Sequence, residues 1–276
     1  MNLKLNFRLN FKSILILILS GSILACAPEK MGSSFNIKSD QYENIIGGQD
    51  LSLKSEINPT VAMLLDTSSA GSFSICTGTF IRKNIILTAA HCVPENSEDL
   101  AVKMGNSLFN EQETKTLNVL KIIRHKDYQS GKNDLALILI QQDKNIFIKP
   151  AVLSDEKTYS KNLLLFGYGD SEIDEVASDD LKGAGSLRKL IVSAKYISHI
   201  ENKFIIDQSH GFGACHGDSG GPAFILNAKN KYVLAGVASG VRQAEDMSDC
   251  TGQSEYTDVS KFQTWILQSI SDFNRN

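Results

Sequence analysis

A serine near the C-terminal end of the chain lies in a glycine-rich segment, Gly217-Asp218-Ser219-Gly220-Gly221-Pro222. Alone, this segment has a composition that is common in turns. Two earlier segments carry the side chains that could activate a serine, namely Thr88-Ala89-Ala90-His91-Cys92 and Asn133-Asp134-Leu135-Ala136-Leu137. A histidine, an aspartate and a serine thus follow one another in the order His91, Asp134, Ser219, which indicates nucleophilic catalysis.

The chemistry explains why these three residue types belong together. A serine hydroxyl is a weak nucleophile at neutral pH, so Ser219 needs a neighbouring base. The imidazole of His91 can accept and return a proton near neutral pH. Asp134 lies in an apolar stretch and would hold the imidazole in the required tautomer and stabilise its protonated form. His91, Asp134 and Ser219 are therefore the candidate catalytic residues.

These motifs resemble those of the chymotrypsin/trypsin-like serine protease family, and the chain is interpreted as an exported bacterial member. The resemblance covers Ile45 to the C-terminus and implies hydrolysis of peptide bonds through an acyl-enzyme on Ser219. The backbone N–H groups of Gly217 and Ser219 would form the oxyanion hole, where each donor lowers the barrier by about 3 kcal/mol. Side chains and backbone supply every group that this chemistry needs, so no metal or organic cofactor is expected.

Ile45-Ile46-Gly47-Gly48 resembles the new N-terminus that zymogens of this family expose when they are cut. The freed ammonium of Ile45 would insert beside Asp218 and order the nucleophile loop. The alternative is that these four residues merely begin a strand. Asn44 precedes the cut, so a trypsin-like activator is not expected, and the activating protease stays open.

The family resemblance also places a pocket for the side chain before the scissile bond. Its floor would be Gly213, six residues before Ser219, where a trypsin-type enzyme has aspartate. Its walls would come from Ser239, Gly240, Val241 and Ser254. Val241 replaces the usual glycine and favours small or medium aliphatic residues, whereas Gly240 stands where tryptophan is usual. We therefore expect an apolar preference and leave its size limit open.

Composition describes an ordinary globular protein. The 276 residues are 42% apolar and carry a net charge of −3, so nucleic acid is not an expected partner. Of the five cysteines, setting Cys26 aside leaves four, which allow three pairings. A zinc site is the rival interpretation, but the chain has no C-x-x-C pair. The resemblance implies the disulfides Cys76–Cys92 and Cys215–Cys250, which require an oxidising compartment.

The N-terminus indicates export. Basic residues precede an apolar run at 14–24 that is too short to span a membrane, so residues 1–25 are predicted to be a signal peptide. Residues 26–44 are polar and are predicted to be a linker or propeptide. Ser22-Ile23-Leu24-Ala25-Cys26 resembles a bacterial lipobox, in which lipidated Cys26 would anchor the protein to the cell envelope. Ordinary signal cleavage near Ala25 would instead release it outside the cell.

From Thr60 onward the chain consists of short β-rich runs separated by turn residues, which predicts an all-β protein. The runs are 61–65, 75–81, 84–88, 101–104, 117–123, 135–141, 163–166, 187–192, 222–226 and 232–239. Apolar residues from Val259 to Phe273 recur at helical spacing and predict a C-terminal helix. The resemblance implies two antiparallel six-stranded β-barrels, the first at 45–150 and the second, with the helix, at 151–276. We expect a monomer that acts on proteins or peptides.

Two other functions use the same residues. A protease-like binding protein would keep the fold but leave the site unformed, and an esterase-like hydrolase would use the same nucleophile on esters. A calcium site is conceivable at Asp170–Asp180, or at Glu111 and Glu113, but a solvated run of charges is the preferred interpretation. His216 is expected to be a polar residue at the rim of the cleft.

Overall fold

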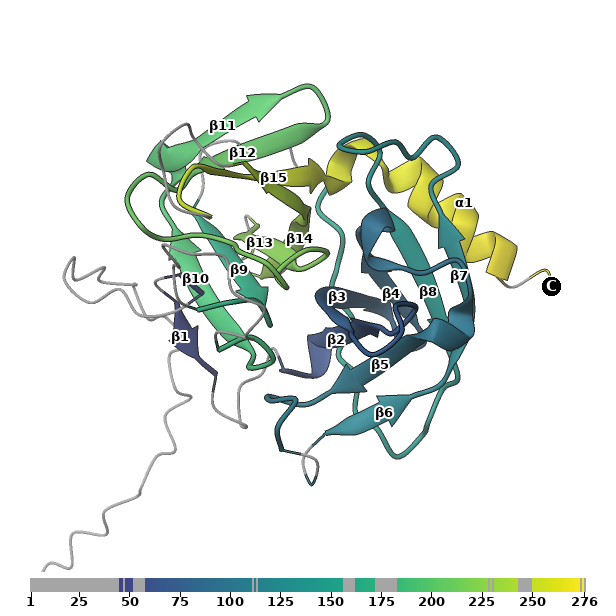
Figure 1. Cartoon of the computed structure of the whole chain (residues 1–276). Coiled ribbons are helices and arrows are strands. Elements are labelled where there is room, and N and C mark those ends of the chain that lie inside the picture. The colour runs from purple at the N-terminus through teal and green to yellow at the C-terminus, as the bar shows by residue number, and fades with distance from the viewer. Residues whose placement is uncertain are drawn as a thin grey trace, which may run out of the picture. The chain divides into compact units, whose positions relative to one another are not determined.

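The computed structural model describes residues 45–46, 48–51, 58–110, 112, 114–155, 162–171, 183–227, 229, 231–242, 250–273 and 275. These residues form antiparallel strands and one α-helix, with short 3-10 turns between them (Figure 1). The predicted signal peptide, the linker, Cys26, Glu111, Glu113 and most of 170–180 lie outside the described residues. Among the described residues, no helix is both long and apolar enough to span a bilayer.

The first sheet has the strand order β6-β5-β2-β3-β4-β8-β7. Its strands are β2 (Val61–Asp66), β3 (Ser74–Arg82), β4 (Ile85–Thr88), β5 (Leu100–Met104), β6 (Lys115–Leu117), β7 (Val119–Arg124) and β8 (Ala136–Ile140). The two edge strands, β6 and β7, are consecutive in the chain and are separated by Asn118 alone. The sheet must therefore curl until its edges meet, and Asn118 forms the corner by accepting the N–H of Gln141 at 2.8 Å.

The second sheet has the order β1-β10-β9-β13-β14-β15-β12-β11. Its strands are β1 (Gln49–Asp50), β9 (Leu163–Gly167), β10 (Arg188–Val192), β11 (Ile197–Ile200), β12 (Lys203–Asp207), β13 (Pro222–Leu226), β14 (Tyr232–Arg242) and β15 (Gln253–Asp258). Strands β10 and β11 lie near opposite edges of this order, yet only a short 3-10 turn, η4 (Ala194–Tyr196), connects them. This sheet is therefore curled as well.

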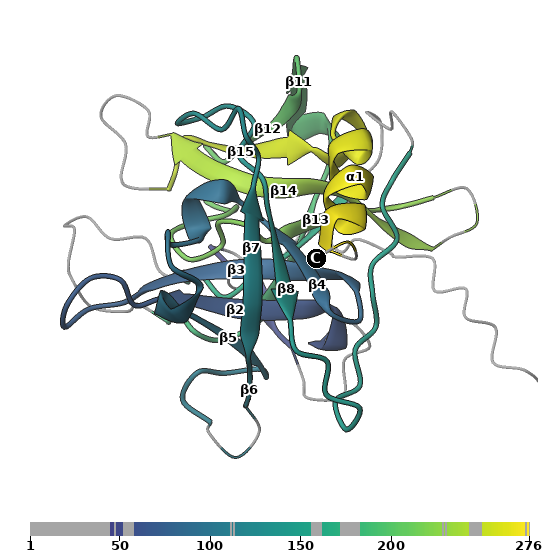
Figure 2. The same cartoon turned by 90° about the vertical axis from the view of Figure 1, so that its right-hand side faces the viewer.

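The helix α1 (Gln263–Phe273) follows the 3-10 turn η5 (Val259–Lys261) and packs beside β8 of the first sheet (Figure 2). Ile266 and Phe273 are buried in the apolar interior that the first sheet contributes to. The rings of Phe262 and Trp265 contact the imidazole of His125, with centroids 5.6 and 4.9 Å apart. The helix therefore ties the C-terminus to the first sheet.

The predicted all-β class, with two antiparallel sheets and a C-terminal helix, is confirmed. The sheets have seven and eight strands instead of six. In the first sheet, the predicted run 117–123 is divided at Asn118 between two strands that pair with different neighbours. In the second, β1 adds to β10 and the hairpin β11–β12 extends the other edge.

The proposed division near residue 150 stays a prediction. Two segments pack with the sheet formed by the other side of this sequence boundary. Strand β1 comes before residue 150 but pairs with β10 of the second sheet, because Asp50 lies directly opposite Arg188. Helix α1 comes after it but buries its apolar face with the first sheet. The two halves of the chain are therefore linked by both ends of the described region.

Candidate active site

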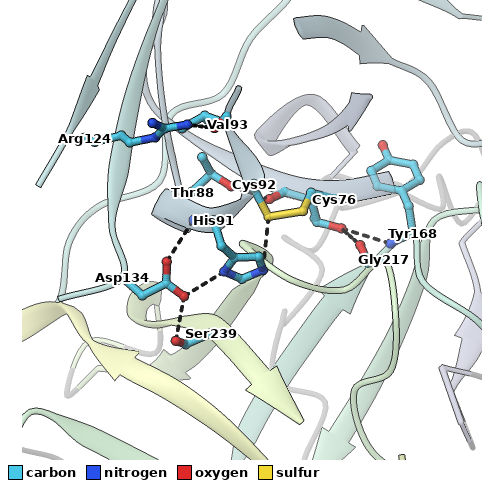
Figure 3. Close-up of a disulfide and its surroundings, with 11 residues drawn as sticks. Cys76, Thr88, His91, Cys92, Val93, Arg124, Asp134, Tyr168, Gly217 and Ser239 are labelled. Atoms are coloured by element: carbon cyan, nitrogen blue, oxygen red, sulfur yellow. Dashed lines mark hydrogen bonds and ion pairs between the residues drawn. A yellow bond between two sulfur atoms is a disulfide. The ribbon is translucent and has the colours of Figure 1, made fainter. Parts of the chain in front are cut away.

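His91 and Asp134 form a doubly bonded pair. His91 lies in the 3-10 turn η2 (Ala90–Cys92) after β4, and Asp134 lies two residues before β8, the neighbour of β4. The Asp134 carboxylate accepts the ring Nδ1 of His91 at 2.7 Å and the backbone N–H of His91 at 3.0 Å (Figure 3). One carboxylate thus fixes both the main chain and the ring, and the proton on Nδ1 leaves Nε2 free to act as a base.

Asp134 is buried, and Ser239 from the second sheet also donates its hydroxyl to it, at 2.7 Å (Figure 3). Burial alone would favour the neutral acid. The hydrogen bond and charge of His91, together with the Ser239 hydroxyl, outweigh burial and hold the pKa of Asp134 below its usual value. Ser239 was predicted only as a pocket wall, so its contact with the carboxylate is an additional role.

The nucleophile loop is held to the first sheet by Thr77, which the sequence analysis missed. Thr77 is fully buried on β3, next to Cys76. Its hydroxyl donates to the carbonyl of Gly217 at 2.9 Å and accepts the N–H of Tyr168 at 3.1 Å. Its backbone N–H donates to the carbonyl of Ser219 at 2.8 Å. One residue of the first sheet thus contacts the loop on both sides of Asp218.

The predicted oxyanion donors are oriented by their peptide neighbours. The carbonyl of His216 accepts the N–H of Asp170 at 2.8 Å, and that of Asp218 accepts the N–H of Gly221 at 2.9 Å. Because C=O and N–H point in opposite directions across a trans peptide, the amides of Gly217 and Ser219 point away from these anchors. Within the described part of the chain, neither amide donates a hydrogen bond.

Gly217 adopts a φ of +93°, and an added Cβ would lie 2.8 Å from the Cα of Gly169. A side chain there would meet both backbone strain and a close backbone neighbour. The glycine is therefore required by the conformation that orients its N–H.

Ser219 and His91 do not share a hydrogen bond in this structure. The ring Nε2 of His91 lies 3.7 Å from Sγ of Cys92 instead (Figure 3). Such catalytic contacts are often loose in unliganded sites and tighten with substrate. The structure thus assembles the pair of His91 and Asp134 and leaves the contact with Ser219 unformed.

The position predicted as the pocket floor has a neutral neighbour. Gly213 has a φ of +152°, and an added Cβ would lie 2.1 Å from the side chain of Gln208. The buried Gln208 carboxamide accepts the N–H of Ala214 at 2.8 Å and donates to the carbonyl of Cys250 at 2.6 Å. No sequence motif indicated a role for Gln208. It occupies the space that a side chain at position 213 would need.

The predicted pocket walls come from two paired strands. Val241 on β14 lies directly opposite Ser254 on β15, and it packs against Ile46 and the disulfide Cys215–Cys250. The Ser254 hydroxyl is buried and makes no hydrogen bond within the described residues. A Cβ added at Gly240 would meet nothing within 4 Å. Val241 and Ser254 therefore flank one face of the sheet, and the space beside Gly240 is open.

Residues 45–266 match the sequence profile of the family described as Trypsin. The chain belongs to the trypsin family. It is 27% identical to chymotrypsin-like elastase family member 1 of Macaca fascicularis, covering 82% of this chain and 90% of that protein. It is 26% identical to cathepsin G of Mus musculus, over 86% and 89%, and 27% identical to phenoloxidase-activating factor 3 of Holotrichia diomphalia, over 82% and 72%. The protein is accordingly a serine endopeptidase, and its substrates are proteins or peptides.

This trypsin-family protein contains both disulfides that the resemblance implied, Cys76–Cys92 and Cys215–Cys250. The first joins the strand that carries Thr77 to the turn that carries His91. The second joins Cys215, two residues before Gly217, to Cys250, three residues before β15. Since these four sulfurs are bonded in pairs, they do not act as thiolate ligands for zinc.

Asp218 is a buried carboxylate with two amide partners. It accepts the N–H of Gly169 and the N–H of Cys215, each at 2.9 Å. Among the described residues, no cation forms an ion pair with it. Burial raises the pKa of Asp218 to about 7, even though both amides favour the charged form. The loop therefore contains an acid that is costly to ionise.

Replacing Thr77 by valine, which keeps the shape but removes the hydroxyl, is expected to lower kcat about tenfold or more. The carbonyl of Gly217 and the N–H of Tyr168 would lose their shared partner, which also costs about 1–3 kcal/mol of folding free energy. Steady-state kinetics and urea unfolding measure the two effects. Thr77→Ser is the control and should retain most of kcat. Equal activity in the valine and wild-type enzymes would contradict the role given to Thr77.

The uncut chain is expected to lose stability as pH rises from about 4 to about 7. In that range folded Asp218 holds a proton that the unfolded chain, with an ordinary carboxyl pKa near 3.9, releases. The loss approaches about 1.4 kcal/mol per pH unit. Urea unfolding of the uncut Ser219→Ala chain at pH 5 and pH 7.5 measures it, and Asp218→Asn in the same background should remove this component. An unchanged pH dependence in the asparagine variant would refute the assignment.

Proposed function

We propose that this protein is an exported serine endopeptidase with Ser219 as nucleophile, His91 as base and Asp134 as its orienting carboxylate. The observation that carries the proposal is the Asp134 carboxylate, which binds the ring and the main chain of His91 and receives the hydroxyl of Ser239. A buried carboxylate with these partners is suited to stabilising a protonated imidazole. The amides of Gly217 and Ser219, which donate no hydrogen bond to any described residue, are suited to a developing oxyanion.

In this mechanism, the hydroxyl oxygen of Ser219 attacks the carbonyl carbon of the substrate while its proton passes to Nε2 of His91. The negative charge on the carbonyl oxygen is stabilised by the N–H groups of Gly217 and Ser219. The intermediate then collapses, the C–N bond breaks, and His91 gives the proton to the departing amine. Water repeats the sequence on the acyl-enzyme and restores the free hydroxyl.

We propose that cleavage before Ile45 activates the enzyme. Ile45 is buried in the interior of the second sheet, and the carbonyl of Ile46 accepts the N–H of Gly213 at 3.0 Å. A new ammonium at Ile45 would supply a cation for the buried Asp218 carboxylate. An ion pair there would remove the cost of ionising this acid and order the loop around it.

Arg188 supports such a coupling between the N-terminal segment and the nucleophile loop. Its buried guanidinium donates to Asp50 at 2.9 Å and to the carbonyl of Gly183 at 2.5 Å. It also donates to the carbonyl of Gly169 at 3.4 Å, and the N–H of Gly169 binds Asp218. The Arg188 guanidinium thus binds both Asp50, which follows the proposed cut, and Gly169, which binds Asp218.

The proposed substrate side chain is apolar and of small or medium size. The neutral Gln208 carboxamide fills the space at the floor beside Gly213, and Val241 lies opposite Ser254 on the wall. The nearby Asp218 carboxylate is turned toward Gly169 and Cys215. The three nearest atoms to a side chain at position 213 all belong to the neutral Gln208.

The substrate main chain has a strand edge available. β13 pairs with β14 only as far as Val237, whereas β15 pairs with β14 to Arg242. The outer edge of β14 beyond Ala238 is therefore unpaired in the described residues, next to the loop that carries Ser219. We propose that the substrate adds there as an antiparallel strand, with the residue that is attacked beside Ser239.

Export is proposed from the N-terminal pattern, with Cys26 as the site of lipid attachment. The two disulfides support it, because such bonds persist in oxidising compartments outside the cytosol.

Labelling with a fluorophosphonate, followed by intact mass, tests the nucleophile and the activation together. We expect a mass shift in the form that begins at Ile45, and none in the precursor from Ala27 or in Ser219→Ala. Labelling of both the precursor and the cut form would keep Ser219 as nucleophile and exclude the activation step. Absence of labelling in either folded form would favour a protease-like binding protein.

A peptide panel that varies only the residue before the scissile bond tests the pocket. We expect alanine, valine or leucine to be preferred over arginine and lysine in kcat/KM. Val241→Gly should shift the ratio of phenylalanine to alanine about tenfold toward phenylalanine, because a branched side chain is removed from the wall. A preference for arginine, or a ratio that Val241→Gly leaves unchanged, would exclude the proposed pocket.

A further inference from the structure

A cluster of charges lies on the outer face of the second sheet, beside the proposed substrate edge. The Glu255 carboxylate forms ion pairs with Lys203 on β12 and with Arg242 on β14. Glu255 and Lys203 are largely buried, with side chains 8% and 17% exposed, whereas the Arg242 side chain is 71% exposed. Among these three described side chains there are two cations and one carboxylate, and the more accessible cation is Arg242.

Strand register places this cluster on the face opposite the predicted pocket. Gly240 lies directly opposite Glu255, and Val241 lies directly opposite Ser254. Successive side chains of a strand point to opposite faces. Val241 and Ser254 share the face of the disulfide Cys215–Cys250, so Gly240, Arg242 and Glu255 share the other face. The ion pair of Arg242 with Glu255 agrees with this assignment.

Another acid, Asp207, lies near this face but forms no ion pair with Arg242 among the described residues. Asp207 lies opposite Gln253, next along β15 from Ser254. Its carboxylate accepts the N–H of Ser209 at 2.9 Å, within its own turn. Among the described residues, the Glu255 carboxylate is therefore the anion that pairs with Arg242.

The inference rests on the proposed function, in which the substrate pairs antiparallel to β14. Counting back from the attacked residue beside Ser239, the second substrate residue lies opposite Gly240, the third opposite Val241 and the fourth opposite Arg242. Alternation puts the second and fourth side chains on the face of the charge cluster. The space beside Gly240 is open, so no side chain at that position separates the substrate from Arg242.

We propose that Arg242 is a specificity-determining residue that binds an acidic side chain at the fourth residue before the scissile bond. The Glu255 carboxylate, on β15, forms an ion pair with Nε of the Arg242 guanidinium. The same strand carries Ser254, a predicted wall of the pocket. The planar guanidinium has further donors that suit a carboxylate. The enzyme would therefore select substrates by two side chains, an apolar one at the residue before the scissile bond and a negatively charged one three residues earlier.

Peptides that differ only at the fourth residue, as aspartate, asparagine, alanine or lysine, test this with active enzyme prepared from the full-length chain. We expect kcat/KM to be about fivefold higher for aspartate than for lysine, the scale of one partly exposed ion pair. Arg242→Gln should remove this preference and leave the alanine peptide within about twofold. The preference should also shrink in 1 M NaCl.

Arg275→Gln is the matched control, because Arg275 is similarly exposed and pairs with Asp272 on the C-terminal helix. It should keep the preference. Equal rates for aspartate and lysine peptides in the wild type, or a preference that survives in Arg242→Gln, would overturn the proposal. Binding of the same peptides to Ser219→Ala, by fluorescence anisotropy, separates this from the catalytic proposal. If no peptide is cleaved, tighter binding of the aspartate peptide that depends on Arg242 still supports the subsite, and equal binding refutes it.

Discussion

The hydrogen bonds of Thr77 across the boundary between the two sheets are the constraint on which the rest of the site depends. The predicted base is carried by the first sheet and the predicted nucleophile by the second, so neither sheet alone contains the reacting groups. Thr77 holds the carbonyls of Gly217 and Ser219 from the strand that a disulfide joins to the turn of His91. Ser239 makes the reciprocal contact from the second sheet to Asp134. Thr77 of the first sheet holds the nucleophile loop, and Ser239 of the second sheet holds Asp134. Together these contacts fix the position of the nucleophile loop relative to His91 and Asp134.

The two buried aspartates of the site have the same side chain but different favoured protonation states, because their surroundings differ. Asp134 faces an imidazole that can become a cation, so its ionised form is favoured. Asp218 faces two amides and no paired cation among the described residues, so its neutral form is favoured near and below neutral pH. In the activation that we propose, the ammonium of Ile45 would supply the cation that favours the ionised form of Asp218. The two carboxylates therefore differ because only Asp134 has a partner that can become a cation among the described residues.

Much of the fold could be predicted because its strands are marked by apolar β-branched runs between turn residues. β2, β3, β4 and β10 lie within a residue or two of their predicted bounds. The hairpin β11–β12 was missed because β11 is mostly exposed and includes Ser198 and His199, so its pattern shows no buried face. β15 was missed as a run because its buried residues include Ser254, Glu255 and Thr257, which are polar. Motifs predicted His91, Asp134 and Ser219 as catalytic residues, but Thr77 and Gln208 act through tertiary contacts that leave no local pattern.

The Gln208 side chain beside Gly213 has a consequence for how this pocket could change. An aspartate at position 213 would give the proposed floor a negative charge, but its Cβ would lie 2.1 Å from the Gln208 carboxamide, which bonds Ala214 and Cys250. Removing Gln208 first would leave those backbone groups without their partner and open a cavity under the pocket. If Gly213 is the pocket floor, as we propose, a charged floor therefore requires coupled replacements at positions 213 and 208.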